Sequence, residues 1–311
     1  MEAVQLLNRK IIETLTKPLP NSNRTFSVLQ WNVLSSELGT PDSFPKVNTD
    51  FLLPTYRKPL IAQDIKTYSP DFVCLEEASK IDLEFFKAID PTKYGCIYHE
   101  KYEGNDGLCF LYNQIKYDLI KSEKESYIDL EKNKKQSQVF QLNVFKPKEQ
   151  EGTQKDFIMV IFTHLKAKAP FASVRLAQLN QLVKRIEEAK TSLLEQVKDA
   201  NLGVVVCGDF NDEPESEPLK YFRGALKTMK SAYEGEVYTT WKIRENTKDD
   251  GVKEMKLTKR VIDYMFYNEN LELLGRSEIP QDDAVDPNGL PCAGYPSDHL
   301  SLFCKFHFTQ K

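Results

Sequence analysis

The chain has 311 residues, of which 41% are hydrophobic and 11% aromatic, and its formal net charge at pH 7 is −4. This composition supports a sizeable hydrophobic core and excludes wholesale disorder. The negative charge excludes a protein that coats nucleic acid along an extended basic face, so any polyanion site must be local. No stretch is long and apolar enough to span a membrane.

The cysteines and the first residues indicate the compartment. Six cysteines are spread through the chain without close pairs, mostly in apolar runs, which favours reduced core thiols over disulfides or zinc. The N-terminus lacks a secretory pattern, and Glu2 and Glu13 argue against a transit peptide. We therefore expect a cytoplasmic protein, with a mitochondrial location as the alternative.

Residues 1–23 are expected to form an N-terminal helix and a linker. Residues 4–15 place apolar side chains at helical spacing, which predicts a short amphipathic helix. Residues 17–23 are rich in proline and asparagine, which is typical of a linker. We therefore assign one catalytic domain to residues 24–311.

Strands dominate the rest of the chain, with a few helices between them. Helical spacing predicts helices over 57–68 and 171–200, and shorter helices are expected over 83–89 and after Pro218. Apolar runs rich in β-formers predict strands. They cover residues 26–34, 71–77, 94–100, 108–112, 138–145, 157–164, 204–209, 238–244, 260–267 and 300–308.

Three polar stretches are expected to be exposed loops, over residues 116–135, 245–259 and 275–294. The chain has no internal repeat and no break in composition that would divide it. The pattern predicts one α/β domain in which two mainly antiparallel sheets pack face to face with helices outside.

Polar side chains follow several buried strands at the point where each strand ends. Residues 204–207 run into Gly208, and side-chain alternation places Asp209 and Asn211 on the same side of the strand tip. Alone, these residues are equally consistent with a turn. Other strand ends repeat the design, which favours a shared site. They carry Asn32, Glu77, His164, Asp263, Asp298 and His299.

Together these groups suit metal-assisted attack of water on phosphorus. Carboxylate and amide oxygens favour Mg²⁺ or Mn²⁺ over zinc. The candidate oxygen ligands are Glu77, Asp209, Asp298 and Asn32. The ion would neutralise charge on the phosphate and lower the pKa of a water molecule.

The remaining groups can move protons and stabilise charge. His299 can act as a general base if Asp263 orients its other ring nitrogen. His164 and Asn211 can donate to phosphate oxygens where charge develops. No Walker-type loop and no Gly-x-Ser-x-Gly elbow occurs, which excludes NTPases and serine hydrolases. A carbohydrate-active enzyme with paired carboxylates remains an alternative, but the lysines and amides fit it poorly.

These motifs, taken in order, resemble the endonuclease/exonuclease/phosphatase superfamily. They are Gln30-Trp31-Asn32, Leu75-Glu76-Glu77, Thr163-His164-Leu165, Gly208-Asp209-Phe210-Asn211, Ile262-Asp263-Tyr264 and Ser297-Asp298-His299. The resemblance implies a four-layer α/β sandwich with the site at the sheet tips. Within the superfamily, residues 30–34, 164–168, 238–244 and 295–302 are similar to nocturnins and to carbon-catabolite-repressor-type deadenylases.

The resemblance also implies roles for individual residues. Glu77 is the expected main Mg²⁺ ligand, with Asn32 in the same shell. Asp209 is expected to position or deprotonate the attacking water, with Asn211 on the phosphate. The implied catalytic set is His164, Asp209, Asn211, Asp263, Asp298 and His299, with His299 and Asp263 as a pair.

Two substrates fit this resemblance. Nocturnins remove the 2′-phosphate of NADP(H), and Lys101, Lys166 and Lys168 look like the residues that hold its phosphates. The alternative is a 3′–5′ exoribonuclease on poly(A), with a few nucleotides stacked near Trp241. A binding protein without catalysis is a third hypothesis, although every expected chemical group is present. No leucine-rich repeat for deadenylase-complex assembly is seen, which favours a stand-alone enzyme.

Several positions depart from the family pattern, including Ser137-Gln138-Val139 in place of Asn-Gln-Val and a shorter loop before Asp106-Gly107. Three single residues also depart from it. Glu76 stands where the family usually has Gln, which adds a negative charge beside the metal ligand. Lys168 stands where nocturnins have Arg, which removes a bidentate fork. Asp212 stands where the family has a small residue. Because an acid in the site would oppose an anionic substrate, we expect Asp212 to point to solvent.

Overall fold

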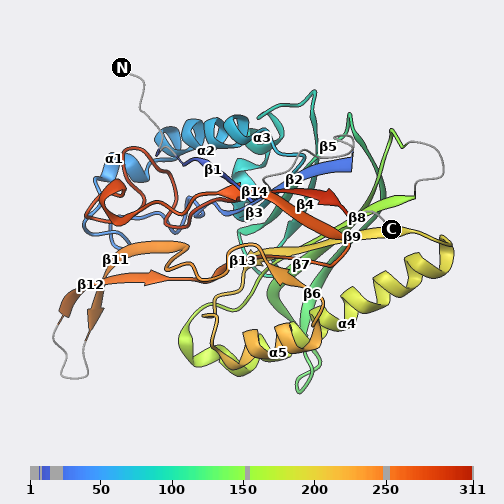
Figure 1. Cartoon of the computed structure of the whole chain (residues 1–311). Coiled ribbons are helices and arrows are strands. Elements are labelled where there is room, and N and C mark those ends of the chain that lie inside the picture. Colours follow the sequence, from blue (N-terminus) through green and yellow to red (C-terminus); the bar gives the residue numbers. More distant parts are fainter. Residues whose placement is uncertain (1–6, 8, 15–23, 151–154, 248–252, 310–311) are drawn as a thin grey trace.

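The computed structural model describes residues 7, 9–14, 24–150, 155–247 and 253–309. Within them, two sheets form the centre of the molecule (Figure 1). The first sheet has the strand order β1-β14-β15-β2-β3-β5-β4 and the second β10-β13-β9-β8-β7-β6. Each sheet has one parallel pair, β2 with β3 and β8 with β9, and its other pairs are antiparallel.

The strands of the first sheet are β1 (Ile11–Glu13), β2 (Thr25–Asn32), β3 (Phe72–Ser79), β4 (Tyr94–Glu100), β5 (Asp106–Asn113), β14 (Leu271–Ser277) and β15 (Leu302–Phe308). Those of the second are β6 (Tyr117–Asp129), β7 (Lys134–Pro147), β8 (Asp156–His164), β9 (Asn201–Asp209), β10 (Lys230–Ser231) and β13 (Asp263–Tyr267). The helices are α1 (Thr49–Leu52), α2 (Pro54–Tyr68), α3 (Leu83–Lys87), α4 (Ala172–Gln196) and α5 (Glu217–Ala225).

Helices lie outside the two sheets, which completes four layers. Figure 1 shows α2 and α3 on the side of the first sheet and α4 and α5 on the side of the second. One apolar cluster joins the inner faces of both sheets with residues of α2 and α3, and the other joins the outer face of the second sheet with α4 and α5. The predicted α/β sandwich is confirmed.

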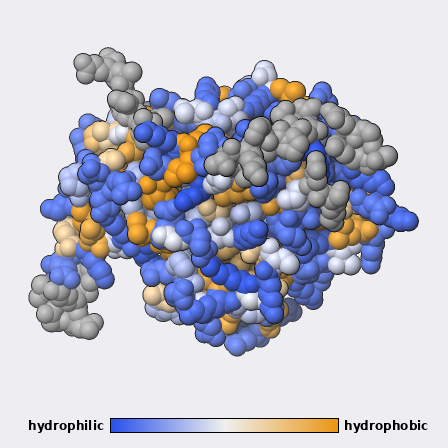
Figure 2. Space-filling model, in the orientation of Figure 1, coloured by the Kyte–Doolittle hydropathy of each residue, from blue (hydrophilic) through white to orange (hydrophobic). Residues whose placement is uncertain are grey.

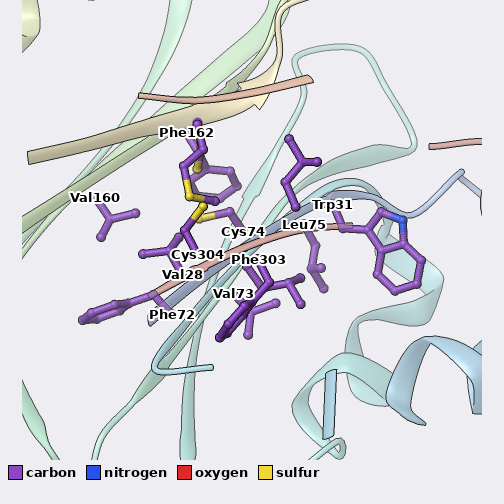
Figure 3. Packing of buried hydrophobic residues seen from close by; sticks show 14 of the residues in the cluster. Val28, Trp31, Phe72, Val73, Cys74, Leu75, Val160, Phe162, Phe303 and Cys304 are labelled. Atoms are coloured by element: carbon purple, nitrogen blue, oxygen red, sulfur yellow. The ribbon is translucent and has the colours of Figure 1, made fainter. Parts of the chain in front are cut away.

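The core between the sheets explains why the strands read as continuous apolar runs. Every residue of β8 and of β9 is buried, because each strand has packed side chains on both faces. Figure 3 shows Val28, Phe72 and Cys74 of the first sheet near Val160 and Phe162 of the second. All six cysteines are free thiols, as predicted.

The N-terminal helix prediction is wrong where the structure describes that segment. Residues 11–13 form β1, which pairs antiparallel with β14. Isolated short helices are marginal in water, whereas β14 offers an unpaired edge to the β-branched residues Ile11 and Ile12. Residues 17–23, predicted as a linker, lie outside the described residues, so the domain boundary stays a prediction.

The three expected loops contain strands. Residues 117–129 form β6, an edge strand with β7 as its partner, and edge strands tolerate lysine and glutamate. Residues 240–247 and 253–260 form a separate two-stranded sheet, β11 (Thr240–Thr247) with β12 (Lys253–Arg260). Strand β14 extends to Ser277, inside the third stretch. No helix among the described residues is long and apolar enough to cross a membrane.

Candidate active site

The strand ends converge as the sequence predicts. The parallel pairs β2–β3 and β8–β9 each finish together, with Asn32 beside Glu76 and His164 beside Asp209. Strand β13 runs antiparallel to β9 and begins at this edge, where Asp263 pairs with Asp209. One end of the sandwich therefore collects side chains from five strands.

Asn32 links the two acids that were predicted to handle metal and water. Its Nδ2 donates to Glu77 Oε1 at 3.0 Å and to Asp209 Oδ2 at 3.1 Å. Glu77 has a φ of 55°, a left-handed conformation that is uncommon outside glycine, at an irregularity of β3 between Leu75 and Ala78. Such bulges re-aim side chains next to functional sites.

His299 and Asp263 form a buried pair. His299 Nδ1 lies 2.9 Å from Asp263 Oδ2, and His299 Nε2 lies 3.9 Å from Asp209 Oδ2. Two further contacts fix the pair: Thr239 Oγ1 donates to Asp263 Oδ2 at 2.7 Å, and Trp31 Nε1 donates to the His299 carbonyl at 2.7 Å. The orienting acid required for His299 is therefore in place.

Burial and neighbouring charges set the protonation of this pair and of Asp209. Burial lowers the pKa of His299, but the negative charges of Asp263 and Asp298 outweigh it and raise the pKa to about 9. Burial, reinforced by the charge of Asp263, raises the pKa of Asp209 to about 7. In the metal-free protein at neutral pH, His299 is therefore protonated, so it can donate a proton and is not the general base expected from the sequence, whereas Asp209 can take up a proton.

His164 has a defined tautomer. Lys101 Nζ lies 3.4 Å from His164 Nδ1, and an ammonium can only donate, so Nδ1 is the acceptor. Burial, together with the charge of Lys101, holds the pKa of His164 well below its usual range. The proton therefore sits on Nε2, which lies 3.6 Å from Asp209 Oδ2. Lys101 also forms an ion pair of 2.5 Å with Asp106.

Asn211 ties two loops together at the site. Its backbone N–H donates to Asp209 Oδ1 at 2.8 Å, and its Nδ2 donates to the Leu165 carbonyl at 3.1 Å. The φ of Asn211 is 53°, a conformation that asparagine tolerates better than most residues. This backbone turn keeps Asn211 beside Asp209 after β9 ends.

The other predicted substrate residues lie at the periphery. Lys166 places its ammonium 4.9 Å from the ring centroid of Phe171, and Lys168 is exposed. Trp241, predicted to stack on nucleotides, is 5% exposed, and Lys259 Nζ lies 3.6 Å from a ring centroid of its indole. Trp241 therefore does not offer an exposed stacking face, because the ring packs inside the fold.

Asp298 has a different role from the one expected of an oxygen ligand. Its Oδ2 forms a 2.6 Å ion pair with Lys242 Nζ and lies 3.8 Å from Arg244. Burial alone would raise the pKa of Asp298, but Lys242 and His299 hold it well below its usual range. The charge of Asp298 is thus committed to these cations. Lys242 and Arg244 were not predicted as site residues, although both lie in residues 238–244, one of the stretches that carry the resemblance.

Glu76 is buried, and burial favours its uncharged form over the negative charge predicted beside Glu77, which departs from that prediction. Its side chain is fully buried and accepts from Gln30 Nε2 at 2.9 Å. Burial raises the pKa of Glu76 well above its usual range, which favours the uncharged carboxylic acid. An uncharged acid has nearly the shape and polarity of glutamine.

Asp212 does not point to solvent, which corrects a second prediction. It is 6% exposed and its Oδ2 accepts from Arg175 Nε at 2.7 Å. Arg175 NH1 donates to the carbonyls of Lys166, at 3.0 Å, and Lys168, at 2.8 Å. The pair therefore fixes the loop that carries both lysines. The positive charge of the buried Arg175 guanidinium offsets the free-energy cost of burying the Asp212 carboxylate next to the site.

The donors at this edge of the sheets fit a hard divalent cation. Asp209, Asp263 and His299 offer ligand atoms within 4.8 Å of one another, and Asn32 brings the carboxylate of Glu77 to Asp209. Because Asp263 and His299 already satisfy each other, the oxygens of Glu77 and Asp209 are the better ligands for a cation.

The site combines buried acids and amides at the sheet tips with an Asp–His pair and a neutral histidine donor. Together with the fold, these features define a hydrolase of phosphoric esters. Residues 29–299 match the model of the Endonuclease/Exonuclease/phosphatase family. The chain belongs to this family, whose enzymes depend on metal ions. It is a phosphoesterase or nuclease of that family, as predicted.

Within this family, the chain is similar to nocturnins and to Ccr4 exoribonuclease subunits. The chain is 30% identical to nocturnin of Xenopus laevis, over 98% of this chain and 78% of that protein. It is 24% identical to the Ccr4 3′–5′-exoribonuclease subunit of the CCR4-Not complex of Candida albicans, over 94% of this chain and 42% of that protein. The human nocturnin catalytic domain with bound sulfate superposes with a TM-score of 0.71 at 25% identity, covering 97% of each chain.

Proposed function

We propose that the chain is a Mg²⁺-dependent phosphatase that removes the 2′-phosphate of NADP(H). The observation that carries the proposal is the cation at the centre of the site: Lys101 contacts His164, which in turn faces Asp209. A terminal phosphate is a compact dianion, and a partly buried ammonium and a neutral N–H donor suit it. Similarity to nocturnins over nearly the whole chain supports this choice.

Mg²⁺ would be held by Glu77 and Asp209, with Asn32 beside them. When bound, the ion would polarise a phosphoryl oxygen and neutralise charge. Asn32 orients both carboxylates through its amide, and its Oδ1 accepts from the Leu34 N–H.

Asp209 serves as the proton acceptor in the reaction and His299 as the proton donor. Asp209 can position a water molecule and accept its proton, because its carboxylate lies at the strand tip beside His164 and His299. His299, with a pKa of about 9, stays protonated and can donate to an oxygen as negative charge develops on it. Asp263 keeps Nδ1 of His299 occupied, so Nε2 is the atom directed toward the reacting group.

The second candidate is a 3′–5′ exoribonuclease on poly(A). Similarity to Ccr4 subunits supports it, and so do the cations Lys242 and Arg244 next to the site. One assay distinguishes the two: NADP⁺, NADPH and labelled A-tract RNA are offered at the same enzyme concentration with Mg²⁺. Release of inorganic phosphate from NADP(H) without RNA shortening supports the phosphatase. A ladder of shortened RNA with no phosphate release contradicts it.

A further inference from the structure

The ribbon formed by β11 and β12 differs in charge from the rest of the protein. It is a sheet of its own, and Figure 1 shows it extending away from the two central sheets. Residues 240–247 and 253–260 contain six cationic and two anionic side chains, in a chain whose net charge is −4. They are Lys242, Arg244, Lys253, Lys256, Lys259 and Arg260, against Glu245 and Glu254.

The register of the ribbon sorts these charges between two faces. Arg244 pairs with Lys256, whereas the next residues along, Ile243 and Leu257, pair on the opposite face. Leu257 is 50% exposed, so the second face is partly apolar. Figure 2 accordingly shows hydrophilic and hydrophobic residues mixed over the ribbon. The face that carries Lys242, Arg244 and Lys256 also carries Glu254, and Arg260, which forms an ion pair with Glu213. We call Lys242, Arg244 and Lys256 the basic face.

The basic face begins at the active site and leads away from it. Lys242 contacts Asp298, the residue next to His299, and Arg244 lies 3.8 Å from the same carboxylate. The Arg244 guanidinium also lies over the ring of Phe44, 5.4 Å from its centroid. Lys242 and Arg244 are alternate residues of β11, about 7 Å apart on one face, and Lys256 lies beside Arg244 on the neighbouring strand, about 5 Å across the ribbon.

We propose that the basic face binds the sugar-phosphate backbone of a single-stranded nucleic acid whose end lies in the active site. A row of cations that tracks a strand is the usual electrostatic footprint for such a ligand. The net negative charge elsewhere disfavours binding over the rest of the surface, which confines the strand to this path. The proposal rests on the proposed function only in that the site accepts a nucleotide end.

Lysine at a sheet edge also prevents edge-to-edge aggregation. That role would be served equally by lysines on either face of the ribbon. Lys256 on the basic face and Lys253 on the opposite face are both exposed and lie on the same strand, so they form a pair for a test. Lys253 also forms an ion pair with Glu245, but both side chains are exposed and such pairs contribute little to stability.

The test measures binding of a labelled 12-nucleotide oligo(A) by fluorescence anisotropy in EDTA, where no cleavage occurs. Lys256→Glu should weaken binding about fivefold, and Lys256→Ala should reduce the slope of log affinity against log salt by about one, the value for one lost phosphate contact. Lys253→Glu should change neither. All three variants should hydrolyse NADPH like the wild type, because neither lysine contacts the site.

Equal effects of Lys256→Glu and Lys253→Glu, or no effect of either, would overturn the proposal. Binding of the wild type to anionic phospholipid vesicles but not to oligo(A) would overturn it as well, and would assign the ribbon to a membrane surface. Oligo(A) binding and NADPH hydrolysis are measured in separate assays, so the two proposals can fail independently. Lys256-dependent RNA binding without hydrolysis of any substrate contradicts the proposed function alone, and NADPH hydrolysis without such binding contradicts the ribbon proposal alone.

Discussion

Replacing Asp212 by asparagine tests the role of its buried ion pair with Arg175. The guanidinium is 2% exposed, and Asp212 is its anionic partner. Losing one partner of a buried pair costs about 3–5 kcal/mol, and asparagine keeps an oxygen acceptor, so we expect a loss near the lower limit, about 3 kcal/mol. For a chain of this length that corresponds to a melting temperature lower by roughly 5 °C.

The same variant should impair substrate binding. Arg175 also holds the carbonyls of Lys166 and Lys168, so a displaced guanidinium loosens the lysine loop. We expect KM for NADPH to rise about tenfold with kcat within twofold, since the catalytic groups stay in place. Thermal unfolding and steady-state kinetics measure both effects. The control is Glu215→Gln, which replaces an exposed acid in the loop that carries Asp212.

Two results would refute this reasoning. If Asp212→Asn is as stable as Glu215→Gln, the charge of Asp212 is not needed to balance Arg175. If stability falls but KM stays unchanged, the pair stabilises the fold without positioning the lysine loop.

Three further predictions concern protonation and charge. The folded pKa of His299, about 9, exceeds the ordinary value of 6.5, so the protonated ring should stabilise the metal-free fold by about 3 kcal/mol below pH 6.5. This contribution should be lost as the pH rises through 9. Urea unfolding at several pH values should show the decline in the wild type and not in His299→Gln. Glu76→Gln should keep kcat/KM within about twofold, because burial favours the uncharged form of the native acid, and a tenfold loss would show that its negative charge is needed. Lys242→Met should lower kcat/KM by at least about tenfold, since Asp298 is left buried without its closest cation beside His299, and an unchanged value would show that Lys242 is dispensable.

The parts that sequence reasoning predicted are local. Buried strands have a clear apolar signature, and a polar residue at the end of such a strand must lie at a sheet tip. Asp209, His164 and Asp263 could therefore be placed together before the fold was known, because β8, β9 and β13 end or begin at one edge. The charged strand β6 was missed because edge strands carry little apolar signal.

The parts that sequence reasoning missed depend on contacts between distant residues. Lys242 meets Asp298 across 56 positions, and Arg175 meets Asp212 across 37. An acid alone in the sequence gives no sign of its partner, so Asp212 was expected in solvent. Burial of Glu76 likewise depends on how the two sheets pack.

Phosphate release from NADPH in Mg²⁺ tests most directly whether these residues form a phosphatase site. The wild type, Glu77→Ala and His299→Ala are compared at equal concentrations, with circular dichroism to confirm that each is folded. We predict Mg²⁺-dependent release by the wild type and a loss of at least about 100-fold in both variants. No release by the wild type would contradict the proposed substrate. Release that survives either substitution would contradict the assignment of the site.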